Sequence, residues 1–130
     1  MNPERVLVVE DSEANRQTLS HLLKKLGFEV VECENGLAAW NLLSKEHAPI
    51  DMILSDIMMP EMDGIELLKR CRETDEFKAT PFFLITAVSD KDYMAAAKAA
   101  GVDGYVVKPL TFQRLKTKMQ EVFPAKKLAA

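Results

Sequence analysis

Three acidic side chains stand directly after short apolar runs of the sequence. Glu10 and Asp11 follow residues 6–9, and Asp56 follows residues 52–55. Carboxylates that lie close together repel one another, which raises some of their pKa values unless a cation neutralises them. Mg²⁺ prefers such hard oxygen ligands, and it keeps coordinated waters that a phosphate group can replace.

A hydroxyl group and an ammonium group stand at two further apolar runs. Thr86 ends the run of residues 81–86, and Lys108 ends the run of residues 104–108. A fixed lysine and a hydroxyl beside a bound metal suit a phosphoryl group. Together with the acids, this spacing predicts a Mg²⁺-dependent phosphoryl site in which an aspartate is the nucleophile.

These side chains can act together only if the fold brings their strands side by side. Strand-like apolar runs alternate with segments of helical periodicity along the whole chain. The predicted strands cover residues 5–9, 29–33, 52–55, 81–86 and 104–108. The predicted helices cover residues 12–26, 36–46, 64–72, 90–100 and 111–122. Such alternation predicts an α/β protein with a parallel sheet and helices on both faces, whose ligands bind beyond the carboxyl ends of the strands.

The composition is that of one globular domain. The chain has 130 residues, of which 48% are hydrophobic, and its net charge is -3. This balance lacks the basic footprint of a nucleic-acid binder, and no apolar run is long enough to span a membrane. The first five residues lack the features of a signal peptide, so we expect a cytoplasmic protein. Cys33 and Cys71 lie in apolar patterns and are predicted to be packing residues.

Four sequence blocks, in this order, resemble the receiver domain of two-component response regulators, of the chemotaxis-receiver type. They are the acid pair at 10–11, Asp-Ile-Met-Met-Pro-Glu-Met-Asp-Gly at 56–64, Leu-Ile-Thr-Ala at 84–87 and Gly-Tyr-Val-Val-Lys-Pro at 104–109. The resemblance implies a flavodoxin-like (βα)5 doubly wound sheet with strand order 2-1-3-4-5. We expect the receiver domain to cover residues 1–124. Residues 125–130 have no periodicity and are expected to be a tail that is partly vector-derived.

The resemblance also implies roles for the acidic residues. Asp56 matches the phosphoacceptor of the family. Asp11 matches a direct Mg²⁺ ligand, with Asp56 and the backbone carbonyl of Met58 completing the protein side. Glu10 corresponds to the other acid of the pair and is expected to act through a bound water.

Further roles follow from the same resemblance. Lys108 matches the lysine that pairs with the phosphoryl oxygens, and Thr86 matches the hydroxyl that moves to bond the phosphoryl group. Tyr105 matches the aromatic residue whose ring turns inward after Thr86 moves. Ala87 leaves room for the phosphoryl group beside Thr86. The Lys108-Pro109 peptide is predicted to be cis.

Two positions are expected to tune the lifetime of the aspartyl phosphate. Met58 and Val88 stand two residues after Asp56 and Thr86, where this family faces the path of the hydrolytic water. Neither side chain holds a water well, so we expect slow autodephosphorylation.

The resemblance implies a signalling switch and not a classical enzyme. A histidine kinase or phosphotransfer domain would donate the phosphoryl group, and the face formed by the fourth helix, fifth strand and fifth helix would contact an output partner that the sequence does not identify. One alternative is a phosphatase of the haloacid dehalogenase type, which needs a second aspartate where Met58 stands. The other is a pseudo-receiver that only mediates protein contacts. His21 and His47 are expected to be surface residues and not phosphohistidine donors.

Overall fold

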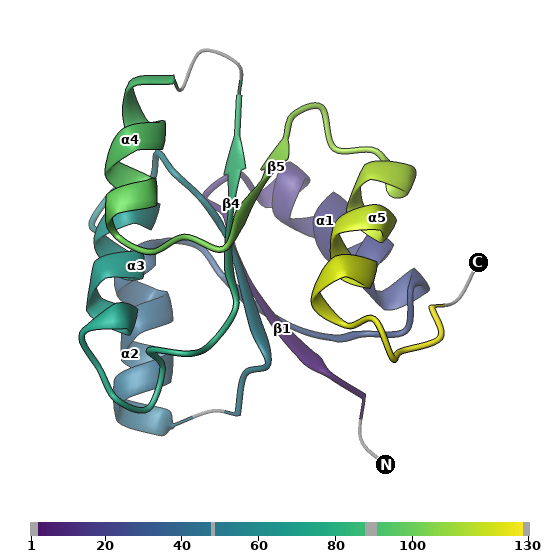
Figure 1. Ribbon diagram of the computed structural model, residues 1–130, viewed down its shortest axis with the longest axis horizontal. Helices are drawn as coiled ribbons and strands as arrows, with labels where there is room; N and C mark the ends of the chain where they lie inside the picture. Colours follow the sequence, from purple (N-terminus) through teal and green to yellow (C-terminus); the bar gives the residue numbers. More distant parts are fainter. Residues whose placement is uncertain (1–2, 48, 88–90, 129–130) are drawn as a thin grey trace.

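Each apolar run of the sequence forms a strand, and each segment of helical periodicity forms a helix. The computed structural model describes residues 3–47, 49–87 and 91–128 (Figure 1). The strands are β1 (Arg5–Val9), β2 (Glu29–Cys33), β3 (Met52–Asp56), β4 (Phe82–Thr86) and β5 (Gly104–Val107). The helices are α1 (Glu13–Lys25), α2 (Gly36–Glu46), α3 (Gly64–Arg72), α4 (Lys91–Ala99) and α5 (Phe112–Val122).

The strands form one parallel sheet in the order β2-β1-β3-β4-β5, which confirms the prediction of the order and of β2 as an edge strand. The register aligns the carboxyl ends of the strands. Val9 pairs with Cys33 and with Ser55, and Asp56 pairs with Ile85. Residues that follow these strands therefore meet at one rim of the sheet.

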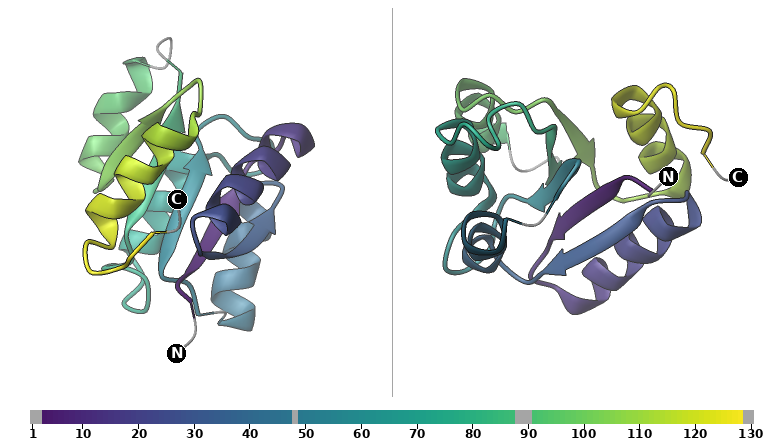
Figure 2. Two further views of the ribbon diagram at one scale, coloured as in Figure 1. Left: turned by 90° about the vertical axis from the view of Figure 1, so that its right-hand side faces the viewer. Right: turned by 90° about the horizontal axis from the view of Figure 1, so that it is seen from below.

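Helices cover both faces of the sheet. α1 and α5 lie on one face, and α2, α3 and α4 lie on the other (Figures 1 and 2). In β1, Leu7 and Val9 pack into the core beneath α2, α3 and α4, whereas Val6 and Val8 pack beneath α1 and α5. Because β1 is buried on both faces, its sequence is continuously apolar and does not alternate with polar residues.

Polar side chains begin the helices immediately after the loops of the rim. The side chain of Ser12 accepts a hydrogen bond from the backbone N–H of Asn15 at the start of α1, and Asp63 accepts from Glu66 at the start of α3. Such caps satisfy N–H groups that the first helical turn leaves without partners. They also fix where each rim loop ends.

The segment after α5 packs against the domain up to the last described residue. The Lys126 Nζ lies 2.7 Å from the Glu4 Oε1 and 5.0 Å from the centre of the Phe28 ring, and Leu128 packs against the core beneath α1 and α5. Lys126 and Leu128 of the predicted tail therefore pack against the domain, which the sequence pattern did not indicate. The absence of periodicity hid these contacts, because single side chains make them.

The two cysteines pack against the apolar core, as predicted from their apolar sequence surroundings. Cys33 and Cys71 are free cysteines, and burial raises the pKa of their thiols to about 11 and about 12. Cys71 is buried in the core beneath α2, α3 and α4, and Cys33 packs against that core. Among the helices of the described residues, none combines the length and the apolar character that a membrane span requires.

Candidate functional site

The acid pair is held at the end of β1 by the strand beside it. The backbone N–H of Glu10 donates to the carbonyl of Cys33 at 3.1 Å, which extends the β1–β2 pairing by one bond. The Glu10 carboxylate turns back and accepts the N–H of Ser12 at 3.2 Å. Glu10 is therefore buried, with 3% of its surface exposed, whereas Asp11 is exposed.

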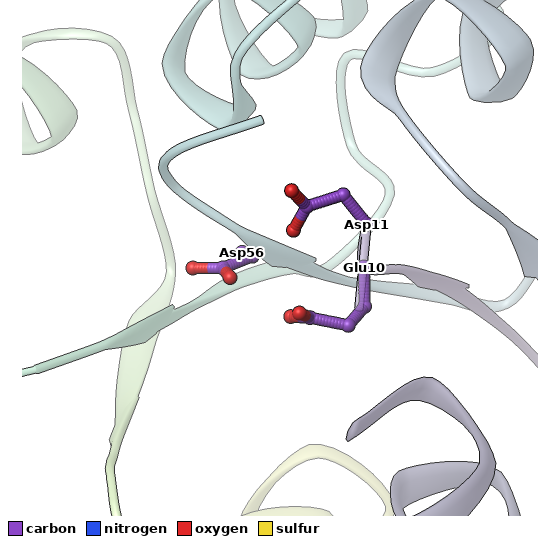
Figure 3. A group of neighbouring side chains, drawn as sticks. All are labelled: Glu10, Asp11 and Asp56. Atoms are coloured by element: carbon purple, nitrogen blue, oxygen red, sulfur yellow. The ribbon is translucent and has the colours of Figure 1, made fainter. Parts of the chain in front are cut away.

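The three predicted acids meet at the rim. Oxygen atoms from Glu10, Asp11 and Asp56 all lie within 4.8 Å of one another (Figure 3). Asp56 is the last residue of β3 and is 7% exposed. The metal-ligand atoms that these three residues offer are all carboxylate oxygens. Mg²⁺ prefers oxygen ligands, so the residues present fit a Mg²⁺ ion.

A cationic side chain faces the third acid. The Lys108 Nζ lies 3.4 Å from the Asp56 Oδ2, and the Asp56 Oδ1 accepts the backbone N–H of Ile57 at 2.8 Å. The backbone N–H of Lys108 donates to the carbonyl of Thr86 at 2.7 Å, which anchors the turn after β5 to the end of β4. The Lys108-Pro109 peptide is cis, as predicted.

The surroundings of Glu10 oppose the ionisation of its carboxyl group. Burial raises the pKa of Glu10 to about 7, and hydrogen bonding to Asp56 and the negative charge of Asp56 act in the same direction. The N–H of Ser12 and the ammonium of Lys108 oppose this increase. A cation bound among the carboxylates would remove the charge repulsion that favours the protonated form.

Gly64 lets the start of α3 pass close to the phosphoacceptor candidate. A Cβ atom at this position would collide with the backbone carbonyl oxygen of Asp56. The Gly64 N–H also donates to the carbonyl of Ile57 at 2.8 Å. The glycine of the 56–64 block is thus required by a close approach of two backbones, and it closes the loop that follows Asp56.

Thr86 and Tyr105 lie on the same face of the sheet. Thr86 stands two residues after Leu84 in β4, and Leu84 pairs in register with Tyr105 in β5. The Tyr105 ring is half-buried against the core beneath α2, α3 and α4, and its hydroxyl donates to the carbonyl of Met94 in α4 at 3.3 Å. Thr86 is buried. The rim residue on β4 and the ring that contacts α4 are therefore on the side of the sheet that α4 covers.

The remaining predicted residues differ in their exposure to solvent. Met58 is 53% exposed in the loop after β3, and Ala87 is half-buried after β4. Val88 lies outside the described residues. His21 and His47 are exposed, as expected, and His47 pairs with Glu76 at 3.1 Å.

Sequence comparison now decides the family. The sequence model of the response regulator receiver domain matches residues 6–120 of the chain. The chain is a receiver domain.

Relatives of this receiver include chemotaxis proteins. It is 40% identical over 119 residues to chemotaxis protein CheY1 of Helicobacter pylori, and the match covers 91% of this chain and 95% of the relative. The structure of the chemotaxis response regulator CheY4 of Vibrio cholerae has a TM-score of 0.83 and 35% identity, and the match covers 93% of this chain and 99% of that one. These similarities agree with the flavodoxin-like strand order of this receiver.

One structural neighbour of this receiver is described with a metal ion. The receiver domain of the sensor histidine kinase PA1611 of Pseudomonas aeruginosa has a magnesium ion coordinated in its active-site cleft. Its TM-score is 0.84 at 25% identity, and the match covers 94% of this chain and 98% of that one. In this receiver, the acidic cluster at the rim could bind a metal.

Sequence reasoning missed side chains that hold the rim in place. Ser12 and Gly64 were not assigned to the site, although a serine before a helix and a glycine after an aspartate are local signals that could have found them. Arg16 was also missed. Its side chain donates to the backbone carbonyl of Glu10 at 2.9 Å, and no sequence pattern identifies a backbone carbonyl as a partner.

Proposed function

We propose that this receiver accepts a phosphoryl group on Asp56 with the help of Mg²⁺ and switches conformation in response. The single observation that carries the proposal is the convergence of Glu10, Asp11 and Asp56 within 4.8 Å, with Lys108 3.4 Å from Asp56. Glu10 and Asp11 follow β1, Asp56 ends the neighbouring strand β3, and Lys108 follows the edge strand β5, so only the folded chain brings these four groups together.

Asp56 acts as the nucleophile. One carboxylate oxygen forms a bond to phosphorus while the phosphorus–nitrogen bond of a donor phosphohistidine breaks, and the electron pair of the broken bond stays on the imidazole nitrogen. A histidine kinase or a phosphotransfer domain supplies that donor. The hydrogen bond from Ile57 N–H to the Asp56 Oδ1 holds the carboxylate in one orientation.

Asp11, Asp56 and the backbone carbonyl of Met58 would hold Mg²⁺, and Glu10 would contribute through a bound water. When bound, Mg²⁺ supplies positive charge that offsets the charge of the phosphoryl oxygens. Lys108 would supply a second positive charge from the end of the edge strand β5, and the Thr86 hydroxyl would donate to a phosphoryl oxygen, for which the small Ala87 leaves room. The chain's own role is to position these groups before the donor arrives.

The phosphoryl group adds about -1.5 to -2 units of charge at the rim. Thr86 moves toward it, and the Tyr105 ring then turns inward, which shifts an existing equilibrium between two conformers. The face formed by α4, β5 and α5 then binds the output partner. Exposed Val107 lies in a groove there beside Arg114 and Lys118.

The test is phosphorylation by a small-molecule donor. The chain is incubated with acetyl phosphate, with and without EDTA, and the added mass is followed by mass spectrometry. The wild type and Asp75→Asn, whose acid is exposed and remote from the rim, should be modified only without EDTA. Asp56→Asn should gain no phosphoryl group. Modification of Asp56→Asn at the wild-type level would overturn the assignment, and an unmodified wild type would favour a pseudo-receiver.

A further inference from the structure

We propose that Arg16 and Glu32 are positioning residues of the metal site, through which the edge strand β2 fixes the direction of the acid pair. The inference rests on the proposed function, because it assumes that Glu10 and Asp11 hold Mg²⁺. It assigns a role to a side chain of α1 and a side chain of β2 that do not belong to the acidic cluster.

Arg16 links the loop after β1 to the edge strand. Its Nη1 donates to the backbone carbonyl of Glu10 at 2.9 Å, and its Nε lies 3.4 Å from the Glu32 Oε1. The backbone N–H of Arg16 donates to the carbonyl of Ser12 at 2.8 Å, so the first turn of α1 fixes the base of the side chain. Only 18% of the Arg16 side chain is exposed, which reduces the competition from water.

With this contact, both backbone polar groups of Glu10 are hydrogen-bonded. The N–H of Glu10 is held by the carbonyl of Cys33, and the carbonyl of Glu10 is held by Arg16. Because a peptide group is planar, fixing that carbonyl also fixes the N–H and the Cα of Asp11. With the N–Cα bond of Asp11 fixed in this way, only rotations within Asp11 itself remain to change the direction of its carboxylate. Outer contacts that orient metal ligands typically change metal affinity 10- to 100-fold when they are removed.

Arginine suits this position better than lysine does. Its planar guanidinium presents donors in fixed directions, so one side chain can hold the Glu10 carbonyl and the Glu32 carboxylate together. A lysine has a single ammonium group, so it can reach either the Glu10 carbonyl or the Glu32 carboxylate more easily than it can reach both. Glu32 should therefore act through Arg16, by holding the guanidinium against the loop.

The chain contains a matched control for this ion pair. Arg5 in β1 and Glu29 in the same edge strand β2 pair at 2.8 Å, at the end of β1 opposite the rim. Their side chains are also partly buried, with 30% and 43% exposed. Loss of this pair should affect the β1–β2 edge as loss of the Arg16 pair does, but it leaves the acid pair untouched.

The experiment measures the dissociation constant of Mg²⁺ by isothermal titration calorimetry. Arg16→Ala should weaken binding about tenfold or more, Arg16→Lys should weaken it less, and Arg5→Ala should bind as the wild type does. Glu32→Gln should weaken binding, and Arg16→Ala combined with Glu32→Gln should bind no more weakly than Arg16→Ala alone. In the metal-free proteins, the amide resonances of Asp11 and Ser12 should shift in Arg16→Ala and stay in place in Arg5→Ala.

Each outcome bears on the inference. Equal Mg²⁺ affinity in Arg16→Ala and Arg5→Ala would overturn it, as would additive losses in the double variant. If circular dichroism shows that Arg16→Ala is unfolded, Glu32→Gln and Arg16→Lys decide in its place, and wild-type affinity in both would overturn the inference. A wild type that binds no Mg²⁺ would instead contradict the proposed function itself.

Discussion

Glu10 is the most deeply buried carboxylate at the rim, and its burial makes the metal-free protein sensitive to pH. Its pKa is raised from 4.5 to about 7 in the folded chain. Between these values the folded state holds a proton that the unfolded state has released. The free energy of unfolding therefore falls as the pH rises through this range, since the proton-binding state is favoured at low pH.

Glu10→Gln should remove this dependence. Without Mg²⁺, the wild type should lose on the order of 1–3 kcal/mol of stability relative to Glu10→Gln between pH 5 and pH 8. Urea denaturation followed by circular dichroism at several pH values measures the difference. If the unfolding free energies of the wild type and Glu10→Gln changed with pH in the same way over this range, the assignment of the raised pKa to Glu10 would be contradicted.

Met58 is exposed beside Asp56, and its thioether cannot position a water by a strong hydrogen bond. We expect a long-lived aspartyl phosphate in the wild type. Met58→Asn should hasten its decay, by about tenfold, because an amide can hold a water in line with the phosphorus. The measurement is the loss of bound phosphoryl group after the donor is removed.

Met58→Leu is the control for this prediction, since it keeps an apolar side chain of similar size. It should decay as the wild type does. Equal lifetimes for Met58→Asn and Met58→Leu would mean that access of a positioned water at this residue does not limit hydrolysis.

At the scale of elements, one arginine joins three segments at the end of the sheet opposite the rim. Arg72, at the end of α3, donates to the carbonyls of Phe77, Thr80 and Gly101. It also pairs with Asp103 at 2.7 Å, and Asp103 in turn accepts the N–H of Phe82. The start of β4 and the turn between α4 and β5 are thus held by one side chain.

Arg72→Ala should lower the free energy of unfolding by about 2–4 kcal/mol, because it removes one donor from four acceptors, two of which, the carbonyls of Phe77 and Thr80, are partly buried. Arg70→Ala, which removes an exposed pair with Glu66, should cost about 0.5 kcal/mol or less. Chemical denaturation followed by circular dichroism compares the two. Fluorescence is unsuitable, since Arg70 lies over the Trp40 ring. Similar losses of unfolding free energy in both variants would contradict the inference that Arg72 holds these segments together.

The elements could be predicted from the sequence because each depends on local patterns. Leu19 and Leu23 recur at helical spacing in α1, and continuous apolar residues form β1. The strand order came only from the family resemblance, since an apolar run does not specify its neighbour. The partners of Arg16 and Arg72 could not be predicted, because these side chains bind backbone carbonyls that the folded loops bring to them.

At the scale of the whole molecule, the acidic cluster lies in the middle of the sheet, and the proposed switch residues Thr86 and Tyr105 lie toward one edge. Tyr105→Ala should still be phosphorylated on Asp56, because the ring does not belong to the acidic cluster. It should lose the change that phosphorylation causes in the amide spectrum of α4, where the Tyr105 hydroxyl binds the carbonyl of Met94. Nuclear magnetic resonance with beryllofluoride measures this change.

Tyr93→Ala provides the comparison, since Tyr93 is exposed on the same helix. Its α4 amides should respond to beryllofluoride as those of the wild type do. A full response in Tyr105→Ala would show that the ring does not carry the signal to α4.

The contact between Lys126 and Glu4 also has a consequence for protein engineering. It brings the segment after α5 beside the start of β1, whereas the acid pair follows the far end of that strand (Figure 1). Fluorescent proteins fused at the two ends would therefore be close to each other and away from the rim. A short linker between the same ends would allow the chain to be circularly permuted, with new termini opened in a loop remote from Asp56.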